Sequence, residues 1–306
     1  MRPPAWLSAV HVGAIVVGVP VLAFWATRAE GVVWSAATGL AAVGGALLAH
    51  LAAALYAFRF RLVMRVVGIH LGAVESLRLN WLATFYQFFV PFAVGADVTR
   101  MVKLKVQNHQ TLPSVSGIVL DHLVGLLALI VLVGVLFVSR RPKGLNFALD
   151  ADPGILGLGV FLVAAGGIAA CWRYRDRARA PLDTLLRHRG ALVLGLLFSV
   201  AMQMLLACAI WAASVAWDLG LAYGDVLFVL SCAQFLQGVP LQIAGAGIAD
   251  VAGAGLFVAL GLTLPAAILL MSLFYLCRLS VAMTGGLWEL WAVRQARLPA
   301  QTGNQA

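Results

Sequence analysis

Apolar runs of roughly 18 residues or more recur along this chain, and they constrain its fold more than any other feature. Each run is long enough to cross about 30 Å of hydrocarbon as a helix. Only 11 % of the 306 residues are charged and 62 % are hydrophobic, so a soluble domain would have little polar surface to present to water. A helix satisfies its backbone hydrogen bonds within the span. The sequence therefore predicts an all-α polytopic membrane protein, with residues 1–306 forming a single transmembrane domain.

Apolar runs of two kinds can be distinguished. Uninterrupted runs predict six full spans, at residues 6–27, 34–58, 114–138, 155–172, 191–216 and 265–292. Proline and glycine interrupt two further apolar stretches, 76–96 and 225–262. We expect both to enter and leave on the same side as re-entrant hairpins. A full crossing by the first would place the cations of 98–110 in hydrocarbon, which costs several kcal/mol.

The basic residues indicate an orientation. The formal net charge is +9, and most Lys and Arg lie between apolar runs, as in Phe58–Arg65 and Arg173–Gly190. Such loops face the cytoplasm and its anionic lipid. Both termini are therefore expected in the cytoplasm. Nucleic-acid binding is disfavoured, because no basic face alternates with aromatic residues on a soluble module.

Metal and cofactor chemistry finds little support in the sequence. The four cysteines have no C-x-x-C spacing and the six histidines form no H-E-x-x-H pair, so we expect no metal, no cofactor and no disulfide. The acidic run Asp150–Asp152 could hold a metal in a membrane-embedded transferase. A turn with solvated carboxylates beside Pro153 is the favoured interpretation, and we expect no enzymatic activity.

The two interrupted stretches resemble one another. Val90–Asp97 (VPFAVGAD) and Val239–Asp250 (VPLQIAGAGIAD) share Val-Pro, an apolar spacer, Gly-Ala and an acid, and each precedes a long span with buried charge. On the counted topology they enter from opposite sides, which predicts an inverted repeat with halves at about 66–138 and 220–292. Such repeats place a transporter-like site near the midplane. The alternative is that proline and glycine simply kink two unrelated helices.

The candidate site combines the helix-breaking and polar positions of both stretches with the charges of the following spans. A broken helix exposes amide and carbonyl groups at membrane depth, which is tolerated where they line a cavity. The candidate cavity residues are Pro91, Gly95, Asp97, Arg100, Asp121, His122, Gln237, Pro240, Gln242, Gly245, Gly247, Asp250 and Arg278.

For two of these charged residues the sequence predicts both a position and a role. Asp121 and Arg278 follow equivalent hairpins, so their helices should lie side by side. We expect Arg278 to attract an anionic head group while Asp121, with His122, sets the local charge. The alternatives are a purely structural ion pair for each charge, and glutamines near the hairpin tips that join helices rather than bind head groups.

The order of three motifs resembles the flippase-like membrane protein family, which includes the transmembrane region of lysylphosphatidylglycerol synthase. These motifs are P-x-x-x-G-A-D-x-x-R (Pro91–Arg100), D-H-L-x-G (Asp121–Gly125) and P-x-x-x-x-G-A-G-x-x-D (Pro240–Asp250). The resemblance implies a protein of the bacterial cytoplasmic (inner) membrane that moves lipids with modified head groups between leaflets. It also implies that four charged residues belong to the central cavity: Asp97, Arg100, Asp121 and Arg278. The chain departs from the family pattern at Ala96, His122 and Asp250, where Gly, Arg and Glu are usual.

The predicted function is a lipid flippase, or a protein that assists lipid translocation, with an anionic or modified head group passing through a midplane polar cavity. One alternative is a non-transporting scaffold or regulator of envelope-lipid synthesis. A second is a membrane-embedded transferase acting on lipid-linked sugar. The expected partners are a membrane lipid as substrate, anionic lipid at the cytoplasmic basic loops, and an enzyme of envelope-lipid synthesis. No nucleic acid is expected.

Overall fold

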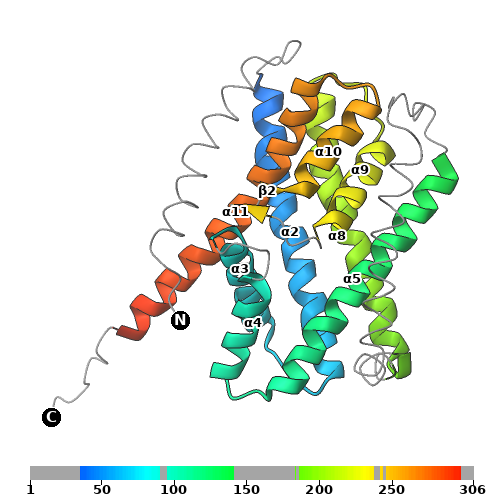
Figure 1. Ribbon diagram of the computed structural model, residues 1–306. Coiled ribbons are helices and arrows are strands. Elements are labelled where there is room, and N and C mark those ends of the chain that lie inside the picture. The colour runs from blue at the N-terminus through cyan, green and yellow to red at the C-terminus, as the bar shows by residue number, and fades with distance from the viewer. Residues whose placement is uncertain are drawn as a thin grey trace.

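The computed structural model describes residues 35–89, 95–140, 183, 186–237, 242–243 and 246–297, and these are helical almost throughout (Figure 1). The elements are α2 (Ala36–Val66), α3 (Ala73–Phe89), α4 (Gly95–Val106), α5 (Thr111–Arg140), α8 (Arg189–Ala216), α9 (Tyr223–Leu236), β1 (Gln242–Ile243), β2 (Ala246–Gly247), α10 (Ile248–Ala259) and α11 (Leu264–Arg297). The predicted all-α membrane fold is confirmed.

Four helices of the described part are long and apolar enough to cross a membrane, namely α2, α5, α8 and α11. They match four of the six predicted spans, at 34–58, 114–138, 191–216 and 265–292. The other two predicted spans, 6–27 and 155–172, lie outside the described residues. The start of α2 follows from a capping box, in which Ser35 and Thr38 each accept a hydrogen bond from the other's backbone N–H.

The end of α2 corrects the sequence interpretation. Phe58–Arg65 was expected to belong to a cytoplasmic loop, but the helix continues to Val66. The helical period places Phe60 and Val63 on the face that packs inward, and both are fully buried. Arg59 lies on the same face and is only 5 % exposed. Its charge does not require water because it meets a carboxylate, as described below.

Both interrupted stretches fold back as helical hairpins. Helix α3 packs against α4, and α9 packs against α10. With 17 residues α3 is about 25 Å long, and with 14 residues α9 is about 21 Å long, so neither alone spans the hydrocarbon. Figure 1 shows the α3–α4 hairpin towards one end of the long helices and the α9–α10 hairpin towards the other. The hairpin residues Pro91, Pro240 and Gly245 lie outside the described residues.

The two halves of the described chain share one order of elements. In each, a long helix is followed by two short ones and a second long one, and the halves run in opposite directions (Figure 1). Helix α2 packs against α8, while α3 packs against α11 and α5 against α9. This is the arrangement that an inverted repeat predicts. The repeat itself, with halves at about 66–138 and 220–292, stays a prediction.

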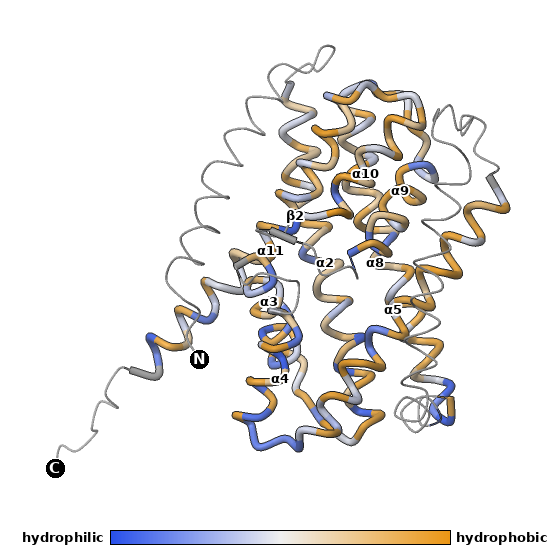
Figure 2. The backbone as a smooth tube through the Cα atoms, viewed as in Figure 1, coloured by the Kyte–Doolittle hydropathy of each residue, from blue (hydrophilic) through white to orange (hydrophobic). Residues whose placement is uncertain are grey.

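Small residues allow the halves to approach closely. At Gly285 of α11 an added Cβ would lie 2.1 Å from the carbonyl oxygen of Trp81 in α3. The backbones of the two helices are therefore in direct contact, as is common where transmembrane helices pack on glycine. The main buried cluster lies between α2, α8, α9, α10 and α11 and includes Phe257, Phe274 and Leu230. Figure 2 shows apolar residues along most of the long helices, with hydrophilic residues gathered at the turn between α4 and α5.

Candidate functional site

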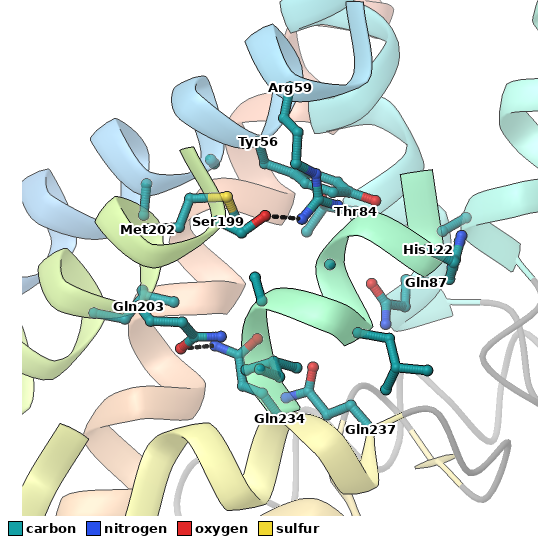
Figure 3. A pocket seen from close by; sticks show the side chains of 18 of the residues that line it. Tyr56, Arg59, Thr84, Gln87, His122, Ser199, Met202, Gln203, Gln234 and Gln237 are labelled. Atoms are coloured by element: carbon teal, nitrogen blue, oxygen red, sulfur yellow. Dashed lines mark hydrogen bonds between the residues drawn. The ribbon is translucent and has the colours of Figure 1, made fainter. Parts of the chain in front are cut away.

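A cavity of about 740 Å³ lies inside the helical bundle, with walls from α2, α3, α4, α5, α8, α9 and α11 (Figure 3). Part of its wall is apolar, and the rest carries charged, amide and hydroxyl groups. The polar lining residues are Tyr56, Arg59, Thr84, Gln87, Asp97, Arg100, His122, Ser199, Gln203, Gln234, Gln237 and Arg278. Polar groups at this depth in an apolar bundle are expensive and usually mark a functional site.

The deepest charge pair joins α2 to α5. Arg59 donates from Nε to Oδ1 and from Nη2 to Oδ2 of Asp121, both at 2.9 Å, and from Nη1 to the Ser199 hydroxyl of α8 at 2.9 Å. Asp121 is only 1 % exposed. Gly125 lies one turn further along the same face of α5, and a Cβ there would be 2.9 Å from Nη1 of Arg59. The D-x-x-x-G spacing therefore provides both the carboxylate and the room for the guanidinium.

A second pair lies at the start of the returning helix α4. Arg100 donates from Nη1 to Oδ1 of Asp97 at 2.8 Å and from Nε to Oδ1 of Asn80 at 3.2 Å. Its guanidinium lies 5.1 Å from the ring centroid of Tyr56, a ring that Arg59 also approaches at 4.7 Å. The ring of Tyr56 therefore lies within cation–π distance of both guanidinium groups.

His122 extends this second pair towards α5. Its Nδ1 donates to the carbonyl of Ile118 at 2.9 Å, and its Nε2 lies 3.5 Å from Oδ2 of Asp97. Both ring nitrogens thus face oxygen atoms, one on α5 and one on α4. The His122 side chain is 56 % exposed, so it is the most accessible of these charged and titratable groups.

The third pair lies in the second half of the chain. Arg278 of α11 donates from Nη2 to Oδ1 of Asp250 at 2.6 Å, and each side chain is 16 % exposed. The other carboxylate oxygen of Asp250 accepts the backbone N–H of Gly247 at 2.9 Å, which caps α10. The guanidinium lies 4.7 Å from the ring centroid of Phe274. One aspartate therefore fixes both the start of α10 and the arginine of α11.

Four glutamines complete the polar wall. Gln234 donates to Gln203 at 3.2 Å and so joins α9 to α8. The buried Nε2 of Gln237 has no hydrogen-bond partner among the described residues. Figure 3 shows Gln87, Gln234 and Gln237 on one side of the drawn space and Tyr56 and Arg59 on the other. The unsatisfied amide indicates a donor available to a bound molecule.

The structure describes ten of the thirteen predicted site residues, and these fall into three groups. Five line the cavity, namely Asp97, Arg100, His122, Gln237 and Arg278. Two bind a lining residue from behind, namely Asp121 and Asp250. Three more belong to the hairpins: Gly95 is the first residue of α4, Gly247 is the N-cap of α10, and Gln242 lies in β1. The remaining three, Pro91, Pro240 and Gly245, lie outside the described residues.

The expected neighbourhood of Asp121 and Arg278 is wrong. Helix α5 packs mainly on α2, α8 and α9, whereas α11 packs mainly on α3, α10 and α2. Asp121 therefore pairs with Arg59, and Arg278 pairs with Asp250. The physical reason is that each hairpin lies against the last helix of the opposite half, so the two last helices are kept apart.

Several lining residues were not predicted, and some left a signal in the sequence. The missed residues are Tyr56, Arg59, Thr84, Ser199 and Gln203. Arg59 was grouped with basic loop residues, although it falls on the helical stripe of Ala52, Phe60 and Val63, all of which are buried. A buried aspartate in the predicted span 114–138 required a cation, and this stripe offered one. For Ser199 and Gln203 the sequence carries no comparable signal.

One known protein family matches this chain. A family model described as "Lysylphosphatidylglycerol synthase TM region" matches residues 9–286, most of the chain. The chain belongs to this family. The resemblance predicted from the three motifs is thereby confirmed, and with it an integral membrane location. Neither curated proteins nor solved structures give a match to the chain.

The family assignment indicates the general kind of function that this protein has. Membership in a membrane family of lysylphosphatidylglycerol synthase-like proteins indicates a lipid-related role in the membrane. The cavity is the part of this fold where a polar molecule could be held at membrane depth. No group of three or more His, Cys, Asp or Glu that could hold a metal occurs within the described ranges. The acidic run Asp150–Asp152 lies outside them.

Proposed function

We propose that this protein moves a membrane lipid between leaflets, with the polar head group held in the cavity and the acyl chains left in the bilayer. The observation that carries the proposal is the polar-lined cavity itself, which lies between two hairpins that run in opposite directions within an apolar bundle. A lipid-related membrane family supports the same role.

Moving a polar head group across a bilayer has a high cost in free energy. A polar head group that crosses bare hydrocarbon loses its hydrogen bonds to water, at several kcal/mol for each unsatisfied group. Amides such as Gln87 and Gln237 and the paired charges of the wall replace those bonds. A volume of about 740 Å³ lies within the range of pockets that hold small ligands. The cavity therefore lowers the barrier without any covalent chemistry.

Lipid movement in reconstituted vesicles tests the proposal. A lipid labelled on its head group is placed in one leaflet, and its loss from that leaflet is followed with an impermeant quencher. We expect protein-containing vesicles to lose the asymmetry at least about tenfold faster than empty ones, which corresponds to a barrier lowered by about 1.4 kcal/mol. Retained asymmetry with folded protein contradicts transport and favours a non-transporting scaffold or regulator.

A matched pair of variants links that movement to the cavity. Gln87→Leu combined with Gln237→Leu keeps side-chain size but removes two amides from the wall. We expect movement to slow by about tenfold, because the head group loses hydrogen bonds it cannot replace. Gln110→Leu is the control, since Gln110 is exposed in the turn between α4 and α5. Equal slowing by the control contradicts a role for the cavity amides.

A further inference from the structure

We infer that the cavity selects a lipid whose head group carries no net charge, an inference that rests on the proposed function of the same site. The observation behind it is a balance of charge. The cavity-lining arginines Arg59, Arg100 and Arg278 each bind one aspartate directly. Three cations are thus matched by three carboxylates among the described residues, and the remaining titratable groups of the wall, Tyr56 and His122, add no charge when neutral.

An anionic head group gains little in such a cavity. Each guanidinium already contacts a carboxylate, at 2.9 Å for Arg59, 2.8 Å for Arg100 and 2.6 Å for Arg278, so its charge is already offset. An anionic head group that takes over such a contact displaces the aspartate. The displaced aspartate would then lose its partner, which costs most for Asp121 at 1 % exposure and less for Asp250 and Asp97 at 16 % and 33 %. A cationic head group meets the same difficulty with the arginines. Head groups with a net charge of either sign are therefore disfavoured.

A polar head group without net charge meets no such penalty. Its hydrogen-bonding partners are the uncharged groups of the wall. The buried Nε2 of Gln237 has no partner among the described residues, and Gln87 also lines the space. An amide donates and accepts, so it can bind a phosphate oxygen, an ammonium group or a sugar hydroxyl equally well. Zwitterionic phospholipids and uncharged glycolipids share this chemistry.

Lipid retention by the purified full-length chain tests the inference. The chain is exposed to four lipids with identical acyl chains. These are phosphatidylethanolamine, diglucosyldiacylglycerol, phosphatidylglycerol and lysylphosphatidylglycerol. Native mass spectrometry then measures the lipid retained. We expect either or both of the first two to be retained about tenfold more than the last two. Which of the two is preferred distinguishes a zwitterionic from an uncharged head group.

Two outcomes overturn the inference: preferential retention of either charged lipid, and equal retention of all four. Retention of none of them overturns it together with the proposed function. A further outcome separates the two proposals. If the chain binds an uncharged or zwitterionic lipid selectively, but the vesicles keep their leaflet asymmetry, the proposed transport is wrong and the inferred selectivity is supported. The failures of the two proposals are therefore distinguishable.

Charge variants provide the sharper comparison. Asp250→Asn removes the negative charge beside Arg278, and its amide oxygen can still accept the N–H of Gly247. We expect preference to move towards phosphatidylglycerol by about tenfold. Asp97→Asn should act in the same direction through Arg100, and it serves if the first variant fails to fold.

Glu289→Gln is the matched control for these variants. Glu289 of α11 contacts Arg78 and Lys103 at the base of the α3–α4 hairpin and does not line the cavity. It loses the same charge, so a general electrostatic effect would change selectivity here as well. We expect no change. A shift with Glu289→Gln equal to the shift with the aspartate variants, or no shift with either folded aspartate variant, overturns the inference.

Discussion

Asp121 is a carboxylate buried in a predicted membrane span, where an isolated charge costs several kcal/mol. The guanidinium of Arg59 offsets this cost through two hydrogen bonds at 2.9 Å, and Ser199 accepts a third N–H of the same group. The carboxylate and the guanidinium of this pair therefore both have hydrogen-bond partners. If one of the two residues were replaced, the other would remain as an unpaired buried charge.

Removing one partner should therefore be worse than removing both. We expect Asp121→Leu to destabilise the protein by about 3–5 kcal/mol, because Arg59 would stay buried and lose its counter-charge. Combining it with Arg59→Met should recover much of that loss. Thermal unfolding in detergent, measured on both variants, checks the expectation. A double variant that is less stable than Asp121→Leu alone would contradict the expectation, because it would show that Arg59 is not a burden without its counter-charge.

The glycine beside this pair offers a matched test on one helix. Gly125→Ala places a Cβ 2.9 Å from Nη1 of Arg59, whereas at Gly134 of the same helix an added Cβ meets nothing within 4 Å. We expect Gly125→Ala to destabilise by about 1–3 kcal/mol. Gly134→Ala should be neutral or stabilising by up to about 1 kcal/mol, since alanine favours the helix. Equal effects in an unfolding assay would argue against steric support of Arg59.

For single residues, the sequence predicts that Asp121 needs a cationic partner, but it does not predict which residue provides it. Asp121 was expected to pair with a cation, because burial of an unpaired carboxylate is expensive. The structure provides Arg59, which lies 62 residues away and was assigned to a loop. Arg278 is 14 positions after Leu264, and the position 14 after Thr111 is Gly125, so Asp121 and Arg278 are not equivalent places in their helices. Short motifs carry no information about which helices are neighbours.

Elements far apart in the chain are held together by close backbone contact. Helix α11 crosses α3 at Gly285, and the next residue, Gly286, packs on the ring of Phe85. Near the base of the same hairpin, Glu289 binds Arg78 of α3 and Lys103 of α4. One end of the hairpin is therefore attached to a helix from the opposite half.

Widening this crossing should loosen the hairpin. Gly285→Ala would place a Cβ 2.1 Å from the carbonyl oxygen of Trp81, so α11 must move away from α3. We expect a loss of about 3 kcal/mol, at the upper end for overpacking, because backbone cannot yield as a side chain can. Gly255→Ala in α10, where nothing lies within 4 Å, is the control. Unfolding of both variants in detergent decides whether this contact supports the fold.

The hairpins were the part of the fold that the sequence indicated most clearly. Proline and glycine within apolar stretches 76–96 and 225–262 predicted a break, and helices end and restart around both. The length of the returning arm was less predictable. Helix α4 carries Lys103 and Lys105 yet continues to Val106, because its outer end lies where the hydrophilic residues gather (Figure 2). Charge alone does not separate a loop from a helix that ends at the membrane surface.

The molecule as a whole has one end that is richer in basic residues. Lys105 is exposed near the turn between α4 and α5, while Thr263 is exposed in the turn between α10 and α11 at the opposite end (Figure 1). By the positive-inside rule the first turn is expected in the cytoplasm and the second outside. Location in the bacterial cytoplasmic membrane and cytoplasmic termini belong to the same expectation.

Cysteine labelling in intact cells tests this orientation. In a background without the native cysteines, Thr263→Cys should react with an impermeant thiol reagent and Lys105→Cys should not. Lys105→Cys should react once the cells are opened, which shows that the site itself is accessible. The reverse pattern in intact cells would invert the orientation and move the basic end to the outside.

The central claim is that a lipid head group occupies the cavity, and the most direct measurement is photo-crosslinking. A lipid with a photoreactive group on its head group is activated in vesicles containing the protein, and the adducts are located by mass spectrometry. The account predicts adducts on cavity residues such as Tyr56, Gln87 and Gln203, lost when excess unmodified lipid competes. Adducts confined to the lipid-exposed face, for example at Leu127 and Val131 of α5, would contradict it.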